Sequence, residues 1–387
     1  MKQSLPTVLQ VLPALETGGV ERSTVDIAQA LVVAGWGSLV ASAGGPMENE
    51  LRRAGADHWQ LPLSGKNPFV IRANVARLVE LIEAEGVDLV HARSRAPAWS
   101  AYHAARRTGR PFVTTFHGAY NFNNPLKRRY NSIMARGDRV IANSKFIDAH
   151  MAEHYHPDPA RVRVVPRGID FERFDPEQVT NERMIRLSDR WRLPDGAPVV
   201  LLPGRLSRWK GHQVLIEALA QLGRPDVRCL LVGSDQGRDS YHRELQKLIK
   251  THGLDQSVHI VDHCDDMPAA FMLADVVVSA SLDPEAFGRV AVEAQAMGRP
   301  TIATDHGGAR ETLVHGETGW LTQPGNIHAL MTALEAALDL DPSARQALAG
   351  RAMARVRAKF SKQSMCEATL AIYGELLDAG PDAIQAA

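Results

Sequence analysis

The chain has 387 residues, of which 45% are hydrophobic and 23% are charged, a composition that is typical of folded globular proteins and excludes a disordered chain. Its 44 basic and 44 acidic residues cancel, which is not the composition of a nucleic-acid-binding protein. One hydrophobic core does not extend over this length, so we expect two domains. No apolar run approaches the roughly 20 residues that span a bilayer, and the N-terminus lacks the pattern of a signal peptide.

Basic residues are concentrated in one part of the first half. Residues 66–145 contain 14 basic and 5 acidic residues, a net charge of +9. This basic segment has two interpretations: a face that meets an anionic acceptor or an anionic membrane, and an ordinary charged surface. The three cysteines, Cys229, Cys264 and Cys366, stand far apart and form no C-x-x-C pair, which predicts a reducing cytoplasm as the location.

The first half of the chain alternates apolar runs with amphipathic segments. A strand at 7–15 is followed by a loop at 16–19 and a helix at 20–35. The further strand candidates are 38–43, 87–92, 111–117, 139–144 and 162–166. This alternation predicts βα units and a parallel sheet.

A second series begins after a charged, proline-bounded segment at 171–195, which we predict to be interdomain. Its strand candidates are 198–204, 227–233, 258–262, 275–280 and 300–305, and its helix candidates are 211–222, 241–253, 267–274 and 285–296. The tail from 342 to 377 is helical in period. Because open α/β sheets bind ligands at the carboxyl ends of their strands, motifs directly after strands are the candidates for ligand binding.

Two motifs follow strands of the first series. Gly18 and Gly19 lie in TGGVER, where paired glycines before a helix let a ligand approach the backbone; the alternative is a plain turn. The segment does not have the G-x-G-x-x-G fingerprint of dinucleotide-binding proteins. His117 follows the strand at 111–117 and could be a core residue, a hydrogen-bond donor to substrate or a proton carrier.

Two further motifs follow strands of the second series. PGRLSRWKGH places Gly204, Arg205 and Lys210 in one short loop, which favours phosphate binding over a solvated basic loop. In DPEAFGRVAVE, Glu285 and Glu293 are separated by seven residues across a predicted helix start. Eight residues of helix rise about 12 Å, of the order of the distance between the two sugars that flank a diphosphate. We therefore expect the helix N-terminus to hold a diphosphate and each glutamate to bind a sugar; alternatively, Glu285 complements the helix dipole and Glu293 is an exposed helix position.

In this order, the motifs resemble those of a family-4 retaining glycosyltransferase of the GT-B fold. The family's pair of glutamates separated by seven residues is matched at Glu285 and Glu293, and its Gly-Arg, four residues, Lys-Gly stretch is matched at 204–211. The resemblance covers nearly the whole chain and is strongest over 199–325. The other matching segments are 164–174 and 298–321.

The resemblance implies two Rossmann-like α/β domains that face each other across a cleft. The domain bounds expected from it are 1–170 for an acceptor-side domain, 171–195 for the interdomain segment, 196–361 for a sugar-nucleotide-binding domain, and about 362–380 for a helix that packs back on the first domain. Gly18 and Gly19 would line the cleft from the first domain. His117 would lie near the transferred sugar.

In the second domain, the resemblance implies that Arg205 and Lys210, in the loop that begins at Gly204, neutralise the diphosphate leaving group. Glu293 would hold the ribose and Glu285 the donor sugar. Backbone near the phosphates would come from Phe287 and Gly288.

By resemblance, the reaction is transfer of a hexose from a UDP- or GDP-sugar to a glycan or glycolipid, such as a lipopolysaccharide core or a lipid-linked glycan, with retention of configuration. No cofactor and no metal is expected, because fixed cations and a helix N-terminus can stabilise the leaving group. The enzyme would be cytoplasmic or peripheral at the inner face of the membrane. Two alternatives remain: a sugar-nucleotide 2-epimerase of the same architecture and a non-catalytic sugar-nucleotide-binding module. A nicotinamide dehydrogenase is less consistent with the sequence, because its glycine fingerprint is missing.

Overall fold

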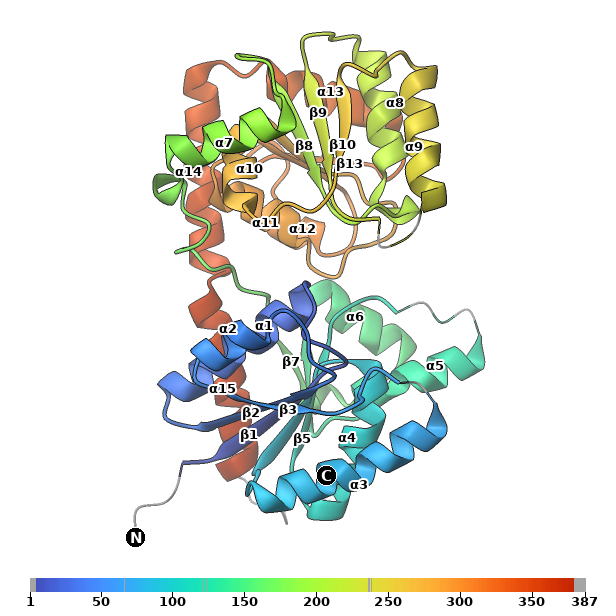
Figure 1. The fold of residues 1–387 in the computed structure, drawn as a ribbon, viewed down its shortest axis with the longest axis vertical. Helices are drawn as coiled ribbons and strands as arrows, with labels where there is room; N and C mark the ends of the chain where they lie inside the picture. The colour runs from blue at the N-terminus through green and yellow to red at the C-terminus, as the bar shows by residue number, and fades with distance from the viewer. Residues whose placement is uncertain are drawn as a thin grey trace. The chain divides into compact units, whose positions relative to one another are not determined.

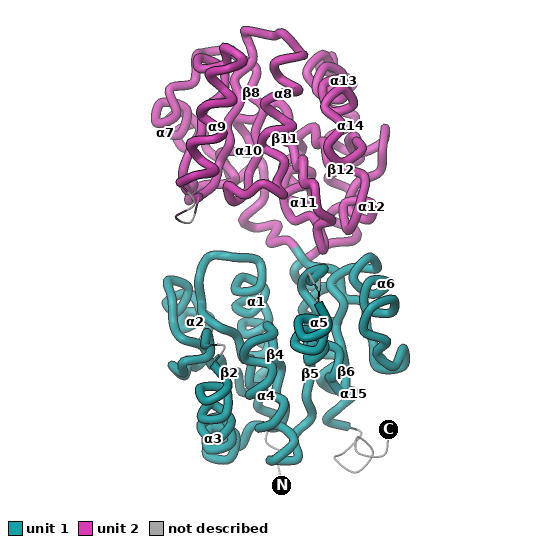
Figure 2. The backbone as a smooth tube through the Cα atoms, turned by 90° about the vertical axis from the view of Figure 1, so that its right-hand side faces the viewer, with its two compact units in different colours: residues 1–168, 362–387 teal, residues 169–361 magenta. Residues whose placement is uncertain are grey.

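The computed structural model describes residues 5–65, 67–120, 122, 124–235, 237 and 239–378. The chain divides into two compact units, 1–168 with 362–387 and 169–361 (Figure 2). Each unit is an open sheet with helices on both faces (Figure 1). The predicted class, two α/β units with parallel sheets, is confirmed.

Among the described residues, unit 1 has seven parallel strands in the order β3-β2-β1-β4-β5-β6-β7. The strands are β1 Thr7–Val11, β2 Gly37–Ser42, β3 Asp57–Gln60, β4 Leu89–Ala92, β5 Phe112–Phe116, β6 Arg139–Ala142 and β7 Val162–Val164. The helices are α1 Gly19–Val33, α2 Glu48–Arg53, α3 Pro68–Ala84, α4 Arg95–Thr108, α5 Pro125–Asn131, α6 Lys145–His154 and α15 Lys362–Asp378.

The described part of unit 2 has six parallel strands in the order β10-β9-β8-β11-β12-β13. The strands are β8 Val199–Pro203, β9 Arg228–Val232, β10 Val258–Val261, β11 Val276–Ser279, β12 Thr301–Thr304 and β13 Trp320–Thr322. The helices are α7 Asn181–Trp191, α8 His212–Leu222, α9 Asp239–Thr251, α10 Met267–Leu273, α11 Arg289–Ala296, α12 Ala309–Thr312, α13 Ile327–Leu338 and α14 Pro342–Lys359.

The sheet of unit 2 is buried on both faces. Along β8, Val199 and Leu201 join one apolar cluster, which also contains residues of α7, α10, α11 and α14. Val200 and Leu202 join a second cluster, with α8, α9 and α13. This period-2 alternation between two apolar faces explains why β8 is a continuous apolar run, as buried parallel strands usually are.

The segment predicted to be interdomain, 171–195, contributes to the core of unit 2. Leu187 and Trp191, four residues apart on one face of α7, are buried with Phe174 and Val179. The chain crosses between the units at 168/169 instead. The many charges of this segment lie on the opposite, exposed face of an amphipathic helix, which is why its sequence resembles a linker.

The helical tail is two helices, which belong to different units. α14 packs in unit 2, and α15 begins after Phe360–Ser361 and packs on α1 in unit 1. The hydroxyl of Tyr373 in α15 lies 2.6 Å from Nδ1 of His91 in β4, and both side chains are fully buried. The last helix therefore completes the core of the first unit.

In both sheets the strand order reverses beside the first strand of the unit. Loops from the two neighbouring strands leave such a point in opposite directions, which opens a crevice at the carboxyl ends. In unit 1 this point lies between β1 and β4, and in unit 2 between β8 and β11. The motifs that follow β8 and β11 therefore meet at one crevice.

Candidate functional site

The loops after β8 and β11 bring together Lys210 and Glu285. The Lys210 ammonium donates to Oε1 of Glu285 at 2.7 Å, and the two side chains are only 13% and 14% exposed. The Lys210 ammonium also lies 4.4 Å from the ring centroid of Trp209. The cation is thus held by a carboxylate and an aromatic face at the switch point of the sheet.

The backbone conformation at position 211 and its close neighbour explain why a glycine follows Lys210. The φ of Gly211, +73°, is left-handed, and a Cβ at this position would collide with the carbonyl oxygen of Ala280, just after β11. Next to this contact, the N–H of Leu282 donates to the Trp209 carbonyl at 2.6 Å. The close approach of the two loops fixes the position of Lys210 relative to Glu285.

The carboxylate of Glu285 is ionised in a nearly buried position. Burial raises its pKa, but the charge and hydrogen bond of Lys210, with hydrogen bonds from Ser281 and Ser279, lower the pKa below its usual value. The two hydroxyls donate at 2.5 and 3.4 Å, and every hydrogen bond from the described residues goes to Oε1. Oε2 accepts none from them and can take a hydroxyl of a ligand.

The expectation that eight residues of helix separate the two glutamates is wrong. Gly288 has a φ of +87°, and α11 begins only at Arg289, so Glu285 lies in the preceding loop. That loop is held by Gly307 and Gly308: the Gly308 N–H donates to the Glu285 carbonyl at 2.8 Å. A Cβ at either glycine would lie 2.5 Å from loop backbone, so side chains here would displace Glu285.

Glu293 lies on α11 and is 9% exposed. Arg289, one turn earlier, donates to its Oε1 from Nη2 at 2.7 Å and from Nε at 3.2 Å. Its Oε2 accepts no hydrogen bond from any described residue. Glu285 and Glu293 therefore share one arrangement, in which one carboxylate oxygen is held by hydrogen bonds and the other accepts none from the described residues.

Arg205 differs from Lys210 because its side chain is exposed, and no hydrogen bond or ion pair of the described residues includes its guanidinium. Gly204, which precedes it with a φ of +156°, donates its N–H to the Val232 carbonyl at 2.8 Å. Phe287 is 3% exposed and packs edge-on against Phe360, so only its backbone could serve a ligand. Gly288, the N-cap of α11, provides no side-chain cap to the helix N-terminus.

In unit 1, His117 follows β5 and is held by Arg167. Nη2 of Arg167 donates to Nδ1 of His117 at 2.7 Å, and because guanidinium only donates, the proton of a neutral ring is on Nε2. Burial and the nearby charge of Arg167 set the pKa of His117 well below its usual value, so the ring is neutral. Nε2 is buried without a partner among the described residues, which leaves one N–H donor for a ligand.

Gly18 and Gly19 begin α1, as expected. Gly18 is extended at a φ of −175°, and a Cβ there would collide with the Oε2 of Glu21. The Gly19 carbonyl accepts from Nη1 of Arg167. In this structure Gly18 makes room for the carboxylate of Glu21 at the start of α1.

Four supporting residues were not predicted: Ser279, Ser281, Arg289 and Arg167. Arg289 could have been found, because residues four apart share a helix face and Glu293 follows it by four. Ser279 and Ser281 precede Glu285 by six and four residues in irregular backbone, which has no sequence period, and Arg167 reaches His117 across 50 residues. No pattern in the sequence indicates such contacts.

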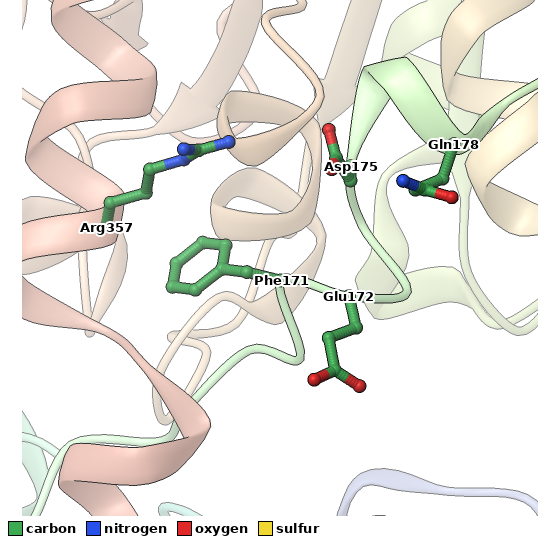
Figure 3. Close-up of a pocket in the computed structure, with 5 residues that line it drawn as sticks. All are labelled: Phe171, Glu172, Asp175, Gln178 and Arg357. Carbon is green, nitrogen blue, oxygen red and sulfur yellow. The ribbon is translucent and has the colours of Figure 1, made fainter.

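The site residues do not line the cavity of about 620 Å³ that opens beside α14 (Figure 3). Its walls come from Arg357 and from the segment after residue 168: Phe171, Glu172, Asp175 and Gln178. The guanidinium of Arg357 lies 6.0 Å from the ring centroid of Phe171. This cavity is therefore separate from the predicted donor site.

Acid should weaken unit 2 through His212, the first residue of α8, which is fully buried. Burial, with the charge of Lys210, lowers the pKa of His212 from 6.5 to about 4. Between these values the unfolded chain binds more protons than the folded one, so stability falls with falling pH. From pH 7 to 4, the free energy of unfolding should drop by about 3 kcal/mol more in the wild type than in His212→Asn.

Urea denaturation at several pH values, followed by tryptophan fluorescence, measures this difference. His263→Asn, which changes an exposed histidine of the same unit, is the control and should follow the wild type. Parallel curves for the wild type and His212→Asn would show that His212 does not carry the effect.

The fold is that of GT-B glycosyltransferases. A glycosyltransferase structure from Rickettsia africae ESF-5 is 38% identical to this chain and superposes with a TM-score of 0.89, covering 97% of this chain and 100% of the other. The Anabaena HepE protein, solved in complex with UDP-glucose, is 25% identical with a TM-score of 0.83, covering 96% and 100%.

Family models match both halves. "Glycosyltransferase Family 4" matches residues 17–173, and "Glycosyl transferases group 1" matches residues 185–354. The D-inositol 3-phosphate glycosyltransferase of Arthrobacter sp. (strain FB24) is 32% identical over 309 residues, which are 75% of this chain and 71% of that relative. The chain belongs to the family-4 glycosyltransferases.

The family, the GT-B fold and transfer from a nucleotide sugar, as predicted from the sequence, are confirmed. The epimerase alternative shares only the architecture, whereas the matching models and relatives are glycosyltransferases. The roles of individual residues, the retention of configuration and the acceptor stay predictions.

Proposed function

We propose that this enzyme transfers a hexose from a nucleoside-diphosphate sugar to a glycan or glycolipid with retention of configuration. The observation that supports it best is the Lys210–Glu285 pair at the switch point of unit 2. It presents a fixed cation and an orientated carboxylate at the crevice where such sheets bind ligands. UDP-glucose in the related Anabaena protein favours a UDP-hexose as donor.

In this proposal, departure of the nucleoside diphosphate builds negative charge that Lys210 and Arg205 neutralise. Lys210 is held in place, so it needs little reorganisation when the charge develops, and Arg205 can move onto the phosphates. The uncapped N-terminus of α11 adds peptide N–H groups. These groups supply the stabilisation that a metal ion gives in other transferases, and we therefore propose a metal-independent reaction.

The two glutamates bind the sugars on either side of the diphosphate. Oε2 of Glu293 accepts from the ribose hydroxyls, while Arg289 keeps the carboxylate orientated. Oε2 of Glu285 accepts from the transferred hexose. His117 donates a hydrogen bond from Nε2–H to a sugar hydroxyl. Its ring is neutral, so it acts as a hydrogen-bond donor and not as a general acid.

For the acceptor we propose a lipopolysaccharide core or a lipid-linked glycan, on account of the basic segment 66–145. The named acceptor of the Arthrobacter relative, D-inositol 3-phosphate, also carries a negative charge. The proposed acceptors and the inositol phosphate named for the relative are therefore all anionic.

Donor hydrolysis tests the proposed function without a known acceptor. The protein should release nucleoside diphosphate slowly from one of a set of UDP- and GDP-hexoses, and that nucleotide should raise the Tm. NMR of the released sugar should show first the anomer that the donor carried, because retention conserves it.

Each other outcome contradicts a part of the proposal. Initial release of the opposite anomer would exclude retention. Solvent deuterium in the recovered donor sugar, without hydrolysis, would indicate an epimerase. Binding of the donor with neither hydrolysis nor transfer would indicate a non-catalytic module.

We also propose that unit 1 contacts anionic membranes through its α3–α4 face. A cavity of about 480 Å³ there is lined by Trp99, Arg72, Arg107 and neighbouring side chains. Phe69, at the start of α3, is 83% exposed and Leu126, in α5, is 80% exposed. Exposed apolar side chains on the same unit as arginines that make no ion pair among the described residues suit the interface of an anionic bilayer. No helix of the described residues is both long and apolar enough to cross a bilayer.

Vesicle flotation tests this contact. The wild type should float with vesicles that contain 30–40% anionic lipid (roughly −30 to −50 mV at the surface) and not with neutral ones. Phe69→Ser/Leu126→Ser should weaken flotation at least about tenfold, since each substitution removes an exposed apolar side chain that the bilayer would bury. Ile185→Ser, which removes a 60% exposed residue of unit 2, is the matched control. Equal flotation with both vesicles would refute the membrane face.

A further inference from the structure

Arg93 lies at the switch point of unit 1 and is nearly buried. It directly follows β4, and its N–H donates to the Val11 carbonyl at 2.8 Å, so the backbone continues the ladder beside β1. The residue is 3% exposed. A guanidinium is thus fixed at the carboxyl edge of the sheet, where open α/β sheets bind ligands.

This guanidinium lacks the partner that a buried charge requires. Its only hydrogen bond among the described residues runs from Nη2 to Oγ of Ser23 at 2.6 Å, and its Nε is buried without a partner. The Ser23 hydroxyl donates to the Val20 carbonyl and so has a lone pair for the arginine. No ion pair of the described residues includes Arg93.

Leaving a charge so incompletely paired is costly. Buried charges in native proteins are paired or bind an ion, because desolvation costs several kcal/mol per charge. Burial lowers the pKa of the Arg93 guanidinium; the carboxylates of Asp26 and Glu21 oppose this shift from a distance, without reaching it. The site thus has positive charge and an unused N–H donor.

The neighbours of Arg93 add to this positive character. Arg167 is 8% exposed, and its guanidinium donates to the Gly19 carbonyl and to Nδ1 of His117. The positive charges of both arginines depress the pKa of His117, which places all three groups in one neighbourhood. The Nε2–H of His117 is the second buried donor without a partner.

We infer that Arg93 binds an anionic oxygen group, a phosphate or a carboxylate, carried by the acceptor. The inference rests on the proposed function, which assigns the diphosphate of the donor to Arg205 and Lys210 in unit 2. An anion bound by unit 1 then belongs to the second substrate. Arg93 is a specificity residue, which favours anionic acceptors over neutral ones.

NMR of the full chain, labelled with ¹⁵N-arginine and kept in saturating UDP, tests this inference with inorganic phosphate and acetate as probes. The Arg93 Nε–H signal, assigned by its loss in Arg93→Lys, should shift and saturate with at least one probe at constant ionic strength. Saturation with phosphate alone identifies a phosphate site, saturation with acetate alone identifies a carboxylate site, and saturation with both shows that the site accepts either group. The Nε–H signal of exposed Arg77 in α3 is the internal control and should not saturate.

Arg93→Met provides a second reading. In this variant the ring signals of His117 should respond to the same probe with affinity about tenfold weaker or worse, a loss of at least 1.4 kcal/mol. Where Arg93→Met does not fold, as checked by circular dichroism, Arg93→Lys replaces it, because it keeps the charge and loses the bidentate fork.

The two proposals fail separately. If the wild type hydrolyses a nucleotide sugar but neither probe moves the Arg93 signal, the acceptor inference is wrong and the proposed function stands. An unchanged affinity for the probe in the folded Arg93 variant would likewise contradict the acceptor inference and leave the proposed function standing. If the wild type hydrolyses no donor, the proposed function itself fails.

Discussion

Replacing Lys210 by methionine is expected to lower turnover by about 10²–10³, the usual cost of removing one preorganised group from a developing negative charge. It should also destabilise unit 2 by about 3–5 kcal/mol, because the buried carboxylate of Glu285 loses its cation. Donor hydrolysis and urea denaturation measure the two effects.

The double variant Lys210→Met/Glu285→Gln separates these effects. A neutral amide removes the uncompensated charge, so most of the stability should return while turnover stays low. A double variant as active as the wild type would exclude Lys210 from the chemistry.

The pH dependence of Lys210→Met provides a further check. Without the lysine, burial raises the pKa of the Glu285 carboxyl above its unfolded value, and the protonated form becomes the stable one in the fold. Stability is then greatest below the unfolded pKa and is lost as the pH rises. The variant should therefore be least destabilised near pH 4 and most destabilised above pH 7.

Arg205→Ala should lower turnover by about 10²–10³ with almost no change in stability. Its guanidinium is exposed and makes no hydrogen bond within the described chain, so its loss should change the free energy of unfolding by less than about 0.5 kcal/mol. The affinity for nucleoside diphosphate should fall too, because the resting side chain is free to grip phosphate.

Arg208→Ala is the matched control for Arg205→Ala. It lies three residues away in the same loop, but its guanidinium pairs with Glu244 on the surface of α9. Turnover in this variant should stay within about twofold of the wild type, since exposed ion pairs contribute little. Equal losses in both variants would mean that general loop charge, and not Arg205, serves the reaction.

The parts of the fold that could be predicted from sequence are the strands and helices whose pattern of apolar residues is visible within one short segment. The buried strand β8 is a continuous apolar run, β1 is apolar except for Thr7 and Gln10, and α1 and α8 repeat apolar residues at helical spacing. β3 was missed, since this edge strand is polar and mostly exposed. β13 has only three residues, too few for a period.

The site followed the same rule. Lys210 could be singled out because it lies in a short loop after β8, and the two glutamates because they stand eight positions apart after β11; their roles stay predictions. The start of α11 was misplaced, because a left-handed Gly288 cannot be distinguished by sequence from a glycine in the first turn. Arg93 was not singled out, because the absence of a carboxylate partner is a property of the packed core.

The return of α15 to unit 1 determines the order in which the chain can fold during synthesis. Unit 2 is one continuous stretch, 169–361, and is complete when that stretch has left the ribosome. Unit 1 has to wait for the final helix, which covers Val8 and Leu89 and supplies Tyr373 to His91. Of the two units, the one whose strands are made first is thus the last to close, and a stop codon after residue 361 would leave part of one face of its sheet uncovered beside α1.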